Sequence, residues 1–427
     1  MIRNNTIVTL RFTMTNDRGH VLEENQTTYL HGSSAISPRL QSQLEGLHAG
    51  DHRTIFLKKG EEDADDNFTF EVFIVDVRDT PPTPAHPQIH LLSGFLGSGK
   101  TTAIREACRY LSKQGIPVAV ITNDQGAHLI DGHLFTHLGI PSGQVTNGCF
   151  CCKYNDLDAA IRHLLKHHAP GVVFAESVGS CTDLIATVLK PLLHQHPEWQ
   201  TTMTTFADAQ LLNSSAPGFD ETVNYIYHKQ LEEAELIVVS KSDLIDTTQL
   251  QTRLESSYPG KTILFQNSFD EAHIARWLRT LDGTPFTKDF PSLDIDYETY
   301  GAGEAKLAWL DQQVNIFSPG KTAQHAAITL IRHLSRAPYP IGHLKFLLDG
   351  QTRISITATG AADHPEPQSA ASATLLVNAR IQTDPAVLSQ LMDDAIRATE
   401  RENRCSIRSL GADCFQPGYP RPTHRIS

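Results

Sequence analysis

Residues 94–101 constrain the fold of this chain more than any other segment, because they read G-x-x-x-x-G-K-T. A strand-like apolar run at 89–92 precedes them, and a helix-like run at 102–111 follows. In that context the N–H groups of a glycine-rich loop and the positive end of a helix surround phosphate oxygens. We expect Lys100 to contact the β- and γ-phosphates and the Thr101 hydroxyl to be a Mg²⁺ ligand. The predicted nucleotide contacts of this loop are Gly94, Gly97, Ser98, Gly99, Lys100, Thr101 and Thr102.

The phosphate-binding loop belongs to a series of apolar runs that alternate with helical stretches. The runs are 89–92, 118–122, 171–175, 203–207, 236–239 and 262–266. Near-continuous apolar strands separated by helices are typical of a parallel sheet covered by helices on both faces. The pattern therefore predicts an α/β fold over residues 88–290, a P-loop NTPase domain with a mostly parallel sheet.

Two smaller sections flank this domain. Residues 1–79 contain short alternating strands and one helical stretch, and the proline-rich residues 80–87 read as an extended linker. Residues 312–402 contain strand-like and helix-like runs that predict a small α+β domain, and the tail at 403–427 has little periodicity.

Acidic side chains are placed to complete the phosphate site. Glu176 ends the run at 171–175, where a parallel sheet would bring its carboxylate across from the phosphate loop. Gly179 can donate its N–H to a γ-phosphate, and Asp131 can approach Mg²⁺ or position water. We expect Lys100, Asp131 and Glu176 to be the catalytic residues.

The choice of base is expected at Ser240, Lys241 and Asp243. A carboxylate at this position can accept from both N1–H and N2–H₂ of guanine, and adenine offers no such pair of donors. The pattern favours GTP over ATP. The usual first residue of this motif is Asn, so Ser240 is the one residue that supports the alternative, an ATP-dependent enzyme.

Three cysteines within four positions, Cys149, Cys151 and Cys152, indicate a site for a soft or borderline metal ion. Zinc takes tetrahedral sulfur and nitrogen ligands, so a fourth ligand is needed, and Asp124, His128 or a water are the candidates. We interpret Cys108 and Cys181 as packing residues, and Cys405 with Cys414 as a weaker second candidate site.

Composition limits the partners. The formal net charge is −12, which disfavours nucleic acid and anionic membranes. We find no signal peptide and no apolar run of membrane-spanning length. The seven cysteines are odd in number and clustered, which fits reduced thiols and a cytoplasmic location better than a disulfide framework.

The motifs at 94–102, 123–126, 131, 147–152, 176–179 and 240–243 together resemble the CobW family of P-loop GTPases, relatives of UreG and HypB. The resemblance implies slow GTP hydrolysis linked to delivery of zinc or cobalt to an unknown client metalloprotein. It leaves a homodimer open. The family usually has Glu where Asp124 stands, so this chain departs from its pattern there.

Residues 19–24, 29–32, 36–40 and 44–51 resemble FKBP-type prolyl isomerases of the SlyD kind. The resemblance implies a module that binds peptides or clients, and the alternative function is a folding factor regulated by nucleotide. The acidic run at 61–66 replaces the segment that usually carries the pocket aromatics, so isomerase activity is not predicted with it.

Overall fold

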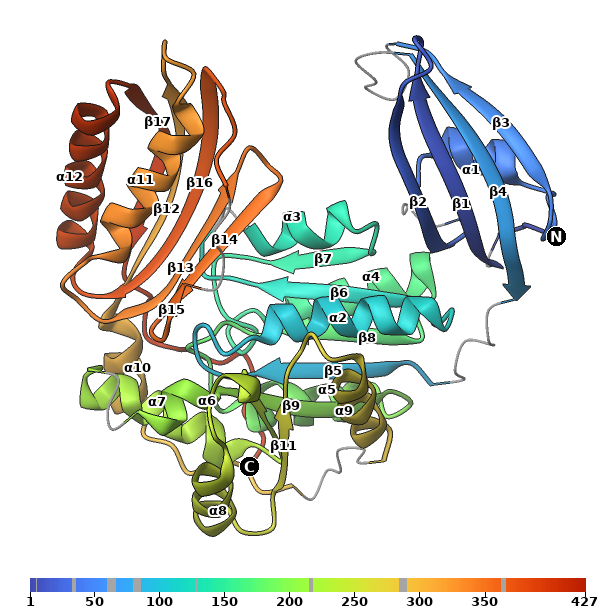
Figure 1. The fold of residues 1–427 in the computed structure, drawn as a ribbon. Coiled ribbons are helices and arrows are strands. Elements are labelled where there is room, and N and C mark those ends of the chain that lie inside the picture. Colours follow the sequence, from blue (N-terminus) through green and yellow to red (C-terminus); the bar gives the residue numbers. More distant parts are fainter. Residues whose placement is uncertain are drawn as a thin grey trace.

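The computed structural model describes residues 1–4, 6–32, 36–59, 67–79, 86–126, 130–214, 218–283, 290–361 and 366–427. Three sheets follow one another along the chain (Figure 1). No helix in these ranges is long and apolar enough to cross a membrane. The acidic run at 61–66 and the linker residues 80–85 lie outside the described residues.

The first domain is a four-stranded antiparallel sheet with one short helix. Its strands are β1 (Thr6–Asn16), β2 (Val21–Leu30), β3 (His52–Leu57) and β4 (Phe68–Asp79), in the order β2-β1-β4-β3. Helix α1 (Pro38–Leu44) buries Leu44 against residues such as Val8 and Ile74. A β-rich first domain is therefore present. Its likeness to prolyl isomerases stays a prediction.

The central domain is a seven-stranded parallel sheet in the order β11-β10-β9-β5-β8-β6-β7. This confirms the predicted fold class. Its strands are β5 (Gln88–Ser93), β6 (Val118–Asn123), β7 (Ser142–Val145), β8 (Val172–Glu176), β9 (Gln200–Asp208), β10 (Leu236–Ser240) and β11 (Thr262–Gln266). Strand β7 was not among the predicted strands, since its sequence Ser-Gly-Gln-Val has a single buried apolar residue.

Helices cover both faces of this sheet, as the apolar runs require. They are α2 (Lys100–Lys113), α3 (Ile130–His137), α4 (Tyr154–His168), α5 (Lys190–Gln195), α6 (Ala209–Asn213), α7 (Glu221–Glu233), α8 (Thr248–Ser257) and α9 (Glu271–Gly283). A short π-helix, η1 (Ile185–Leu189), and a 3-10 helix, η2 (Ser242–Leu244), complete the set. Two large apolar clusters include strand residues with opposite orientations, such as Leu91 in one and Leu92 in the other.

The C-terminal sheet has six strands in the order β15-β14-β13-β16-β12-β17. They are β12 (Leu307–Phe317), β13 (Ile341–Leu348), β14 (Thr352–Thr357), β15 (Gly360–Ala361), β16 (Ser372–Gln382) and β17 (Ser406–Phe415), with helices α10 (Tyr297–Ala305), α11 (Ala323–Ser335) and α12 (Pro385–Asn403). The sheet extends beyond the expected bounds 312 and 402. Strand β17 lies in the expected tail, and its exposed edge pattern explains why periodicity gave no signal there.

Candidate functional site

The phosphate-binding loop joins β5 to α2, as the motif predicts. Gly99 has φ 89° and immediately precedes Lys100, the first residue of the helix. The Lys100 ammonium donates to the carbonyl oxygens of Gly94 (2.5 Å) and Phe95 (3.3 Å). Gly94 has φ +128°, and a Cβ there would lie 2.1 Å from the carbonyl oxygen of Phe206. Only glycine fits that backbone conformation and that space.

Hydroxyl groups of the loop are positioned for phosphate and cation binding. The Thr101 hydroxyl donates to the Glu176 carboxylate over 2.7 Å, and both side chains are buried. The Ser98 Oγ is buried and has no hydrogen-bond partner among the described residues. Paired hydroxyl and carboxylate oxygens are the ligands that Mg²⁺ prefers, and an unpartnered buried hydroxyl fits a missing phosphate oxygen. The residues therefore fit a Mg²⁺–nucleotide complex.

The segment after β8 packs directly on the phosphate loop. A Cβ at Gly179 would lie 2.9 Å from the backbone nitrogen of Leu96. Residues 176–179 and Thr102 line the same cavity, of about 270 Å³. The structure thus brings Glu176 and Gly179 to the loop, as the sequence predicted. Asp131 lies in α3, and its side chain is outside the described residues, as is His128.

Ser240, Lys241 and Asp243, which we expect to contact the nucleotide base, have different surroundings in the structure. The Ser240 hydroxyl donates to the Ser98 carbonyl oxygen over 2.7 Å, so it supports the phosphate loop from below. The Lys241 ammonium contacts the Asp208 carboxylate at 2.5 Å and lines the cavity. Asp243 lies in η2, two residues further on, and is not among the residues that line the cavity.

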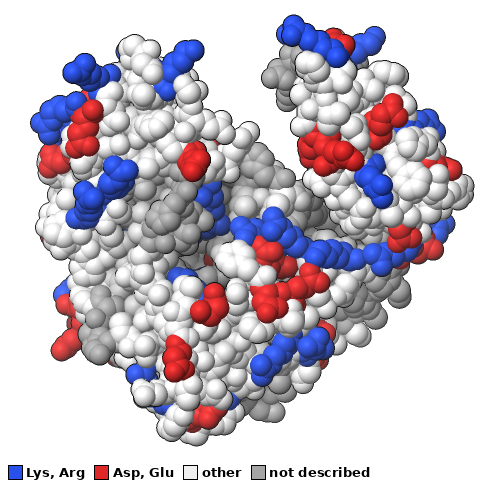
Figure 2. Space-filling model, viewed as in Figure 1, with Lys and Arg blue, Asp and Glu red and all other residues white. Residues whose placement is uncertain are grey.

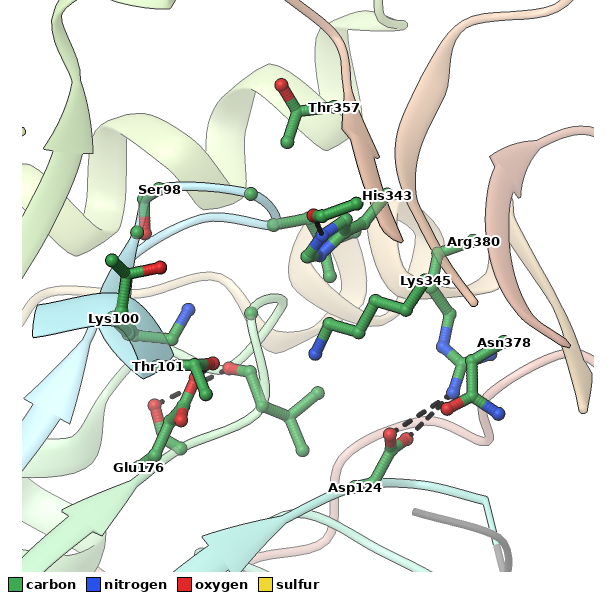
Figure 3. A pocket seen from close by; sticks show the side chains of 18 of the residues that line it. Ser98, Lys100, Thr101, Asp124, Glu176, His343, Lys345, Thr357, Asn378 and Arg380 are labelled. Atoms are coloured by element: carbon green, nitrogen blue, oxygen red, sulfur yellow. Dashed lines mark hydrogen bonds and ion pairs between the residues drawn. The ribbon is translucent and has the colours of Figure 1, made fainter. Parts of the chain in front are cut away.

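The C-terminal sheet forms the other wall of the cavity, which sequence reasoning did not predict (Figure 3). Among the charged side chains that line the cavity, that of Arg380 in β16 is the most buried, and it lies over the Trp309 ring at 3.8 Å. Its guanidinium donates to Asp311 (2.8 Å) and to both carboxylate oxygens of Asp124 (3.0 and 3.2 Å). The buried guanidinium is shared by two carboxylates, and these charge-assisted hydrogen bonds fix the end of β6 to the C-terminal sheet.

The three predicted thiols converge at the start of α4. Their Sγ–Sγ distances are 2.9 Å (Cys149–Cys151), 3.4 Å (Cys149–Cys152) and 3.8 Å (Cys151–Cys152). They form the one group of three or more potential metal ligands found among the described residues. Cys149 and Cys151 are buried and Cys152 is partly exposed. Three sulfurs at these separations can face one ion.

A fourth thiol that we had interpreted as a packing residue lies beside this group. Cys181 is fully buried, and side-chain interactions with Cys149 and then with Cys151 lower the pKa of its thiol to about 6. Its sulfur is outside the group of three whose ligand atoms lie within 4.8 Å of one another. Its separation in sequence from the other cysteines hid this contact. Asp124 is not part of the thiol group, because Arg380 holds its carboxylate.

A buried carboxyl group also adjoins the thiols. Burial, and then the charge of Cys149, raises the pKa of the Glu304 carboxyl well above its usual range. It accepts hydrogen bonds from Ser180 (2.7 Å) and Gln125 (3.3 Å). Glu304 of α10 therefore joins the loop after β6 to the loop after β8.

Residues 416–427 lie across the thiol cluster, and we call them the covering segment. The Arg421 N–H donates to Cys152 Sγ (3.2 Å), and the Thr423 N–H donates to the Cys151 carbonyl oxygen (2.9 Å). The Arg425 guanidinium donates to buried Asp183 (2.8 Å). The tail that showed no periodicity is thus fixed by specific contacts at the candidate metal site.

The structure agrees with the predicted role of Cys108 but, among the described residues, groups neither Cys405 nor Cys414 with other potential metal ligands. Cys108 is fully buried on α2, in agreement with a packing role. The thiols of Cys405 and Cys414 donate to the carbonyl oxygens of Thr399 and Pro385. Neither belongs to a group of three potential ligands in the described part of the chain.

Several known proteins are similar to part of this chain. The zinc chaperone YjiA of Escherichia coli (strain K12) is 36% identical over 22% of this chain and 30% of its own length. The zinc chaperone CobW of Sinorhizobium sp is 26% identical over 38% of this chain and 52% of its own length. This chain thus spans about a third to a half of the curated relatives it matches. Among solved structures, nickel-bound HypB from Helicobacter pylori is 17% identical over 49% of this chain and 91% of its own, with a TM-score of 0.35.

A protein-family model matches the part of the chain that contains the candidate site. It is described as CobW/HypB/UreG, nucleotide-binding domain, and it matches residues 88–264, which include the phosphate loop, the thiol cluster and Glu176. Residues 88–264 are therefore similar to the nucleotide-binding domain of the CobW/HypB/UreG proteins.

Proposed function

We propose that this chain binds GTP with Mg²⁺, hydrolyses it slowly to GDP and phosphate, and couples this to binding zinc or cobalt and delivering it to a client metalloprotein. The Thr101–Glu176 pair supports the Mg²⁺ and the phosphate loop supports the triphosphate. The buried thiols support a soft or borderline ion, and relatives of the central domain are named zinc chaperones.

The observation that carries the coupling is that residues 123–126 contact both halves of the site. The Asn123 side chain donates to the carbonyl oxygens of Val145 (2.9 Å) and Gly148 (2.7 Å) and accepts from the Phe150 N–H (2.9 Å). It thus holds the loop that carries the thiols. The next residue, Asp124, holds Arg380 at the nucleotide cavity.

Gln125 and Gly126, the other two residues of this segment, also contact both the surroundings of the thiols and the C-terminal sheet. Gln125 contacts Glu304 beside the thiols, and a Cβ at Gly126 would lie 1.7 Å from Asp311 Oδ2. Glycine at 126 is therefore required for the segment to lie against the Arg380–Asp311 pair. A change in the nucleotide cavity that displaces this segment would alter the thiol geometry, which is a differential effect on metal affinity.

For the fourth metal ligand we now favour Cys181 over Asp124. Cys181 is a buried thiol whose pKa is lowered by Cys149 and then by Cys151, and it follows Gly179 by two residues. Its sulfur lies outside the group of three in this structure, so as a fourth ligand it would have to approach them. A thiolate attached to the segment that faces the phosphates would let the nucleotide state add or remove one sulfur from the metal. Four-thiolate and three-thiolate sites differ in how readily the ion leaves.

Equilibrium dialysis of the full chain with zinc, in the presence of GDP or a non-hydrolysable GTP analogue, tests the coupling. We expect about one zinc per chain and an affinity that differs about 5- to 150-fold between the nucleotides. Cys151→Ala should abolish the tight site, and the partly exposed Cys405→Ser serves as the matched control. Zinc retention that is the same with both nucleotides would contradict the coupling.

Competition between GTP and ATP tests the base preference. Asp243 is the proposed acceptor for guanine, so Asp243→Asn should weaken GTP binding more than ATP binding. Equal binding of both nucleotides by the unaltered chain would favour the ATP-dependent alternative.

A further inference from the structure

The face of the C-terminal sheet opposite its helices is polar and charged where it meets the nucleotide cavity. Along β13 and β14, buried residues such as Leu344 and Ile354 alternate with partly exposed ones. The buried set packs in the cluster that includes α11 and α12. The alternate set lines the cavity, and comprises His343, Lys345, Arg353, Ser355 and Thr357, joined by Asn378 and Arg380 of β16.

Close packing on the phosphate loop fixes the position of this face. A Cβ at Gly97, where φ is +74°, would lie 2.6 Å from Thr357 Cγ2. A Cβ at Gly342 would lie 2.8 Å from Leu96 Cδ1. Because two glycines are needed where the sheet meets the loop, the sheet rests directly on the loop that binds phosphate.

The cavity gathers positive charge in an acidic protein. Lys100, Arg105 and Lys241 line it from the central domain, and Lys345, Arg353 and Arg380 line it from the C-terminal sheet. The carboxylates that line it are Asp124 and Glu176. Figure 2 shows Lys and Arg side chains where the central domain meets the C-terminal domain. With a net charge of −12 for the whole chain, this local excess indicates an anionic ligand.

Lys345 is placed differently from Arg380. Arg380 lies between Asp124 and Asp311. The Lys345 side chain extends from β13 into the cavity toward the side where Lys100, Thr101 and Glu176 lie (Figure 3). A lysine ammonium acts as a point charge on phosphate oxygens, so this direction is suited to a group bound between the loop and the sheet.

We propose that Lys345 is a phosphate-binding residue that the C-terminal sheet supplies in cis, with its ammonium against the terminal phosphate of the bound nucleoside triphosphate. The inference rests on the proposed function for the identity of the ligand. Lys100 and Thr101 hold the phosphates from one side, and Lys345 neutralises charge from the other. A diphosphate lacks the group that Lys345 contacts, so the C-terminal sheet distinguishes the two nucleotide states.

The test is the ratio of the dissociation constants for GDP and a non-hydrolysable GTP analogue, measured on the full chain with Mg²⁺. We expect Lys345→Ala to weaken analogue binding about 10-fold, as loss of one charge-assisted contact does, and to change GDP binding less than about 2-fold. Lys345→Arg should retain most of the selectivity. Lys321→Ala, a lysine of the same domain that does not line the cavity, is the matched control.

A loss of folded stability would not move this ratio, so the measurement separates a ligand contact from a structural role. GTP hydrolysis by Lys345→Ala should also be slowed, by about 10- to 100-fold. An unchanged ratio, or equal weakening of both nucleotides, would overturn the role of Lys345 and leave the proposed function intact. Failure of the unaltered chain to bind either nucleotide would overturn both.

Discussion

The guanidinium of Arg380 donates two hydrogen bonds to the carboxylate of Asp124, across a separation of 256 residues in the chain. Asp124 directly follows Asn123, the residue that holds the cysteine-bearing loop. The end of one strand, β6, therefore contacts the C-terminal sheet and the backbone of the cysteine-bearing loop through adjacent side chains.

Replacing Arg380 by Met should destabilise the fold by about 3–5 kcal/mol, because it leaves two carboxylates without their cation in a buried site. The Asp311 side chain is fully buried and that of Asp124 is 14% exposed. Urea denaturation measures the effect. Arg397→Met is the control, since its ion pair with Asp394 is exposed and should contribute less than about 1 kcal/mol. Similar losses in both variants would refute the account.

Asn123→Ala should lower zinc affinity about 10- to 100-fold although no thiol is changed, because residues that orient metal ligands have effects of that size. Its three hydrogen bonds to the backbone of the cysteine loop would be lost. Competition with a chromophoric zinc chelator gives the affinity. Gln144→Ala, an exposed residue on the adjacent strand β7, should leave it unchanged. Unaltered affinity in Asn123→Ala would show that the thiols are positioned without this side chain.

Arg425→Ala should speed the reaction of Cys152 with a thiol reagent several-fold, because it releases the covering segment from Asp183. Arg421→Ala is a matched control. The Arg421 backbone N–H, which alanine retains, donates to Cys152 Sγ. The reaction is followed by absorbance on zinc-free protein, and Cys152→Ser identifies the reacting thiol. Equal rates in all arginine variants would mean that the segment does not limit access.

Glu233 should make folding stability depend on pH. Burial raises the pKa of its carboxyl to about 8, above the ordinary value of 4.5. Between these values the folded chain keeps a proton that the unfolded chain releases. The stabilisation is therefore complete below about pH 4.5 and is lost as the pH rises through about 8.

Glu233→Gln should accordingly flatten the decline of unfolding free energy between pH 5.5 and 7.5, by up to about 1.4 kcal/mol per pH unit. Urea denaturation at several pH values measures the slope. Glu232→Gln, at the exposed neighbouring position, should keep the slope of the unaltered chain. A slope that is the same in both variants would contradict a raised pKa at Glu233.

Sequence patterns predicted those features whose residues are close together in the chain. The phosphate loop follows a strand and opens a helix, and three thiols are adjacent, so local spacing was enough. Glu176 was found because parallel strands bring their carboxyl ends to one edge. The six predicted strands of the central sheet were confirmed, since continuous apolar runs mark buried parallel strands.

The rest depends on contacts between distant segments. Cys181 reaches the thiol cluster from a different loop, and nothing in its own neighbourhood distinguishes it from a packing cysteine. Asp124 follows a strand, as a metal ligand would, but its partner Arg380 comes from another domain. Around Lys345, strand β13 alternates buried and partly exposed residues, as any half-buried strand does. Only the packing of the C-terminal sheet on the central domain shows that its partly exposed side chains line the cavity.

The covering segment continues directly from β17, which is hydrogen-bonded to β12 along the C-terminal sheet. The same sheet rests on the phosphate loop. A few residues of backbone thus connect the C-terminal sheet, which packs on the phosphate loop, to the covering segment, which contacts Cys152. A displacement of the sheet would therefore also move the Arg421 N–H that donates to Cys152 Sγ, so the exposure of this sulfur would depend on the position of the sheet.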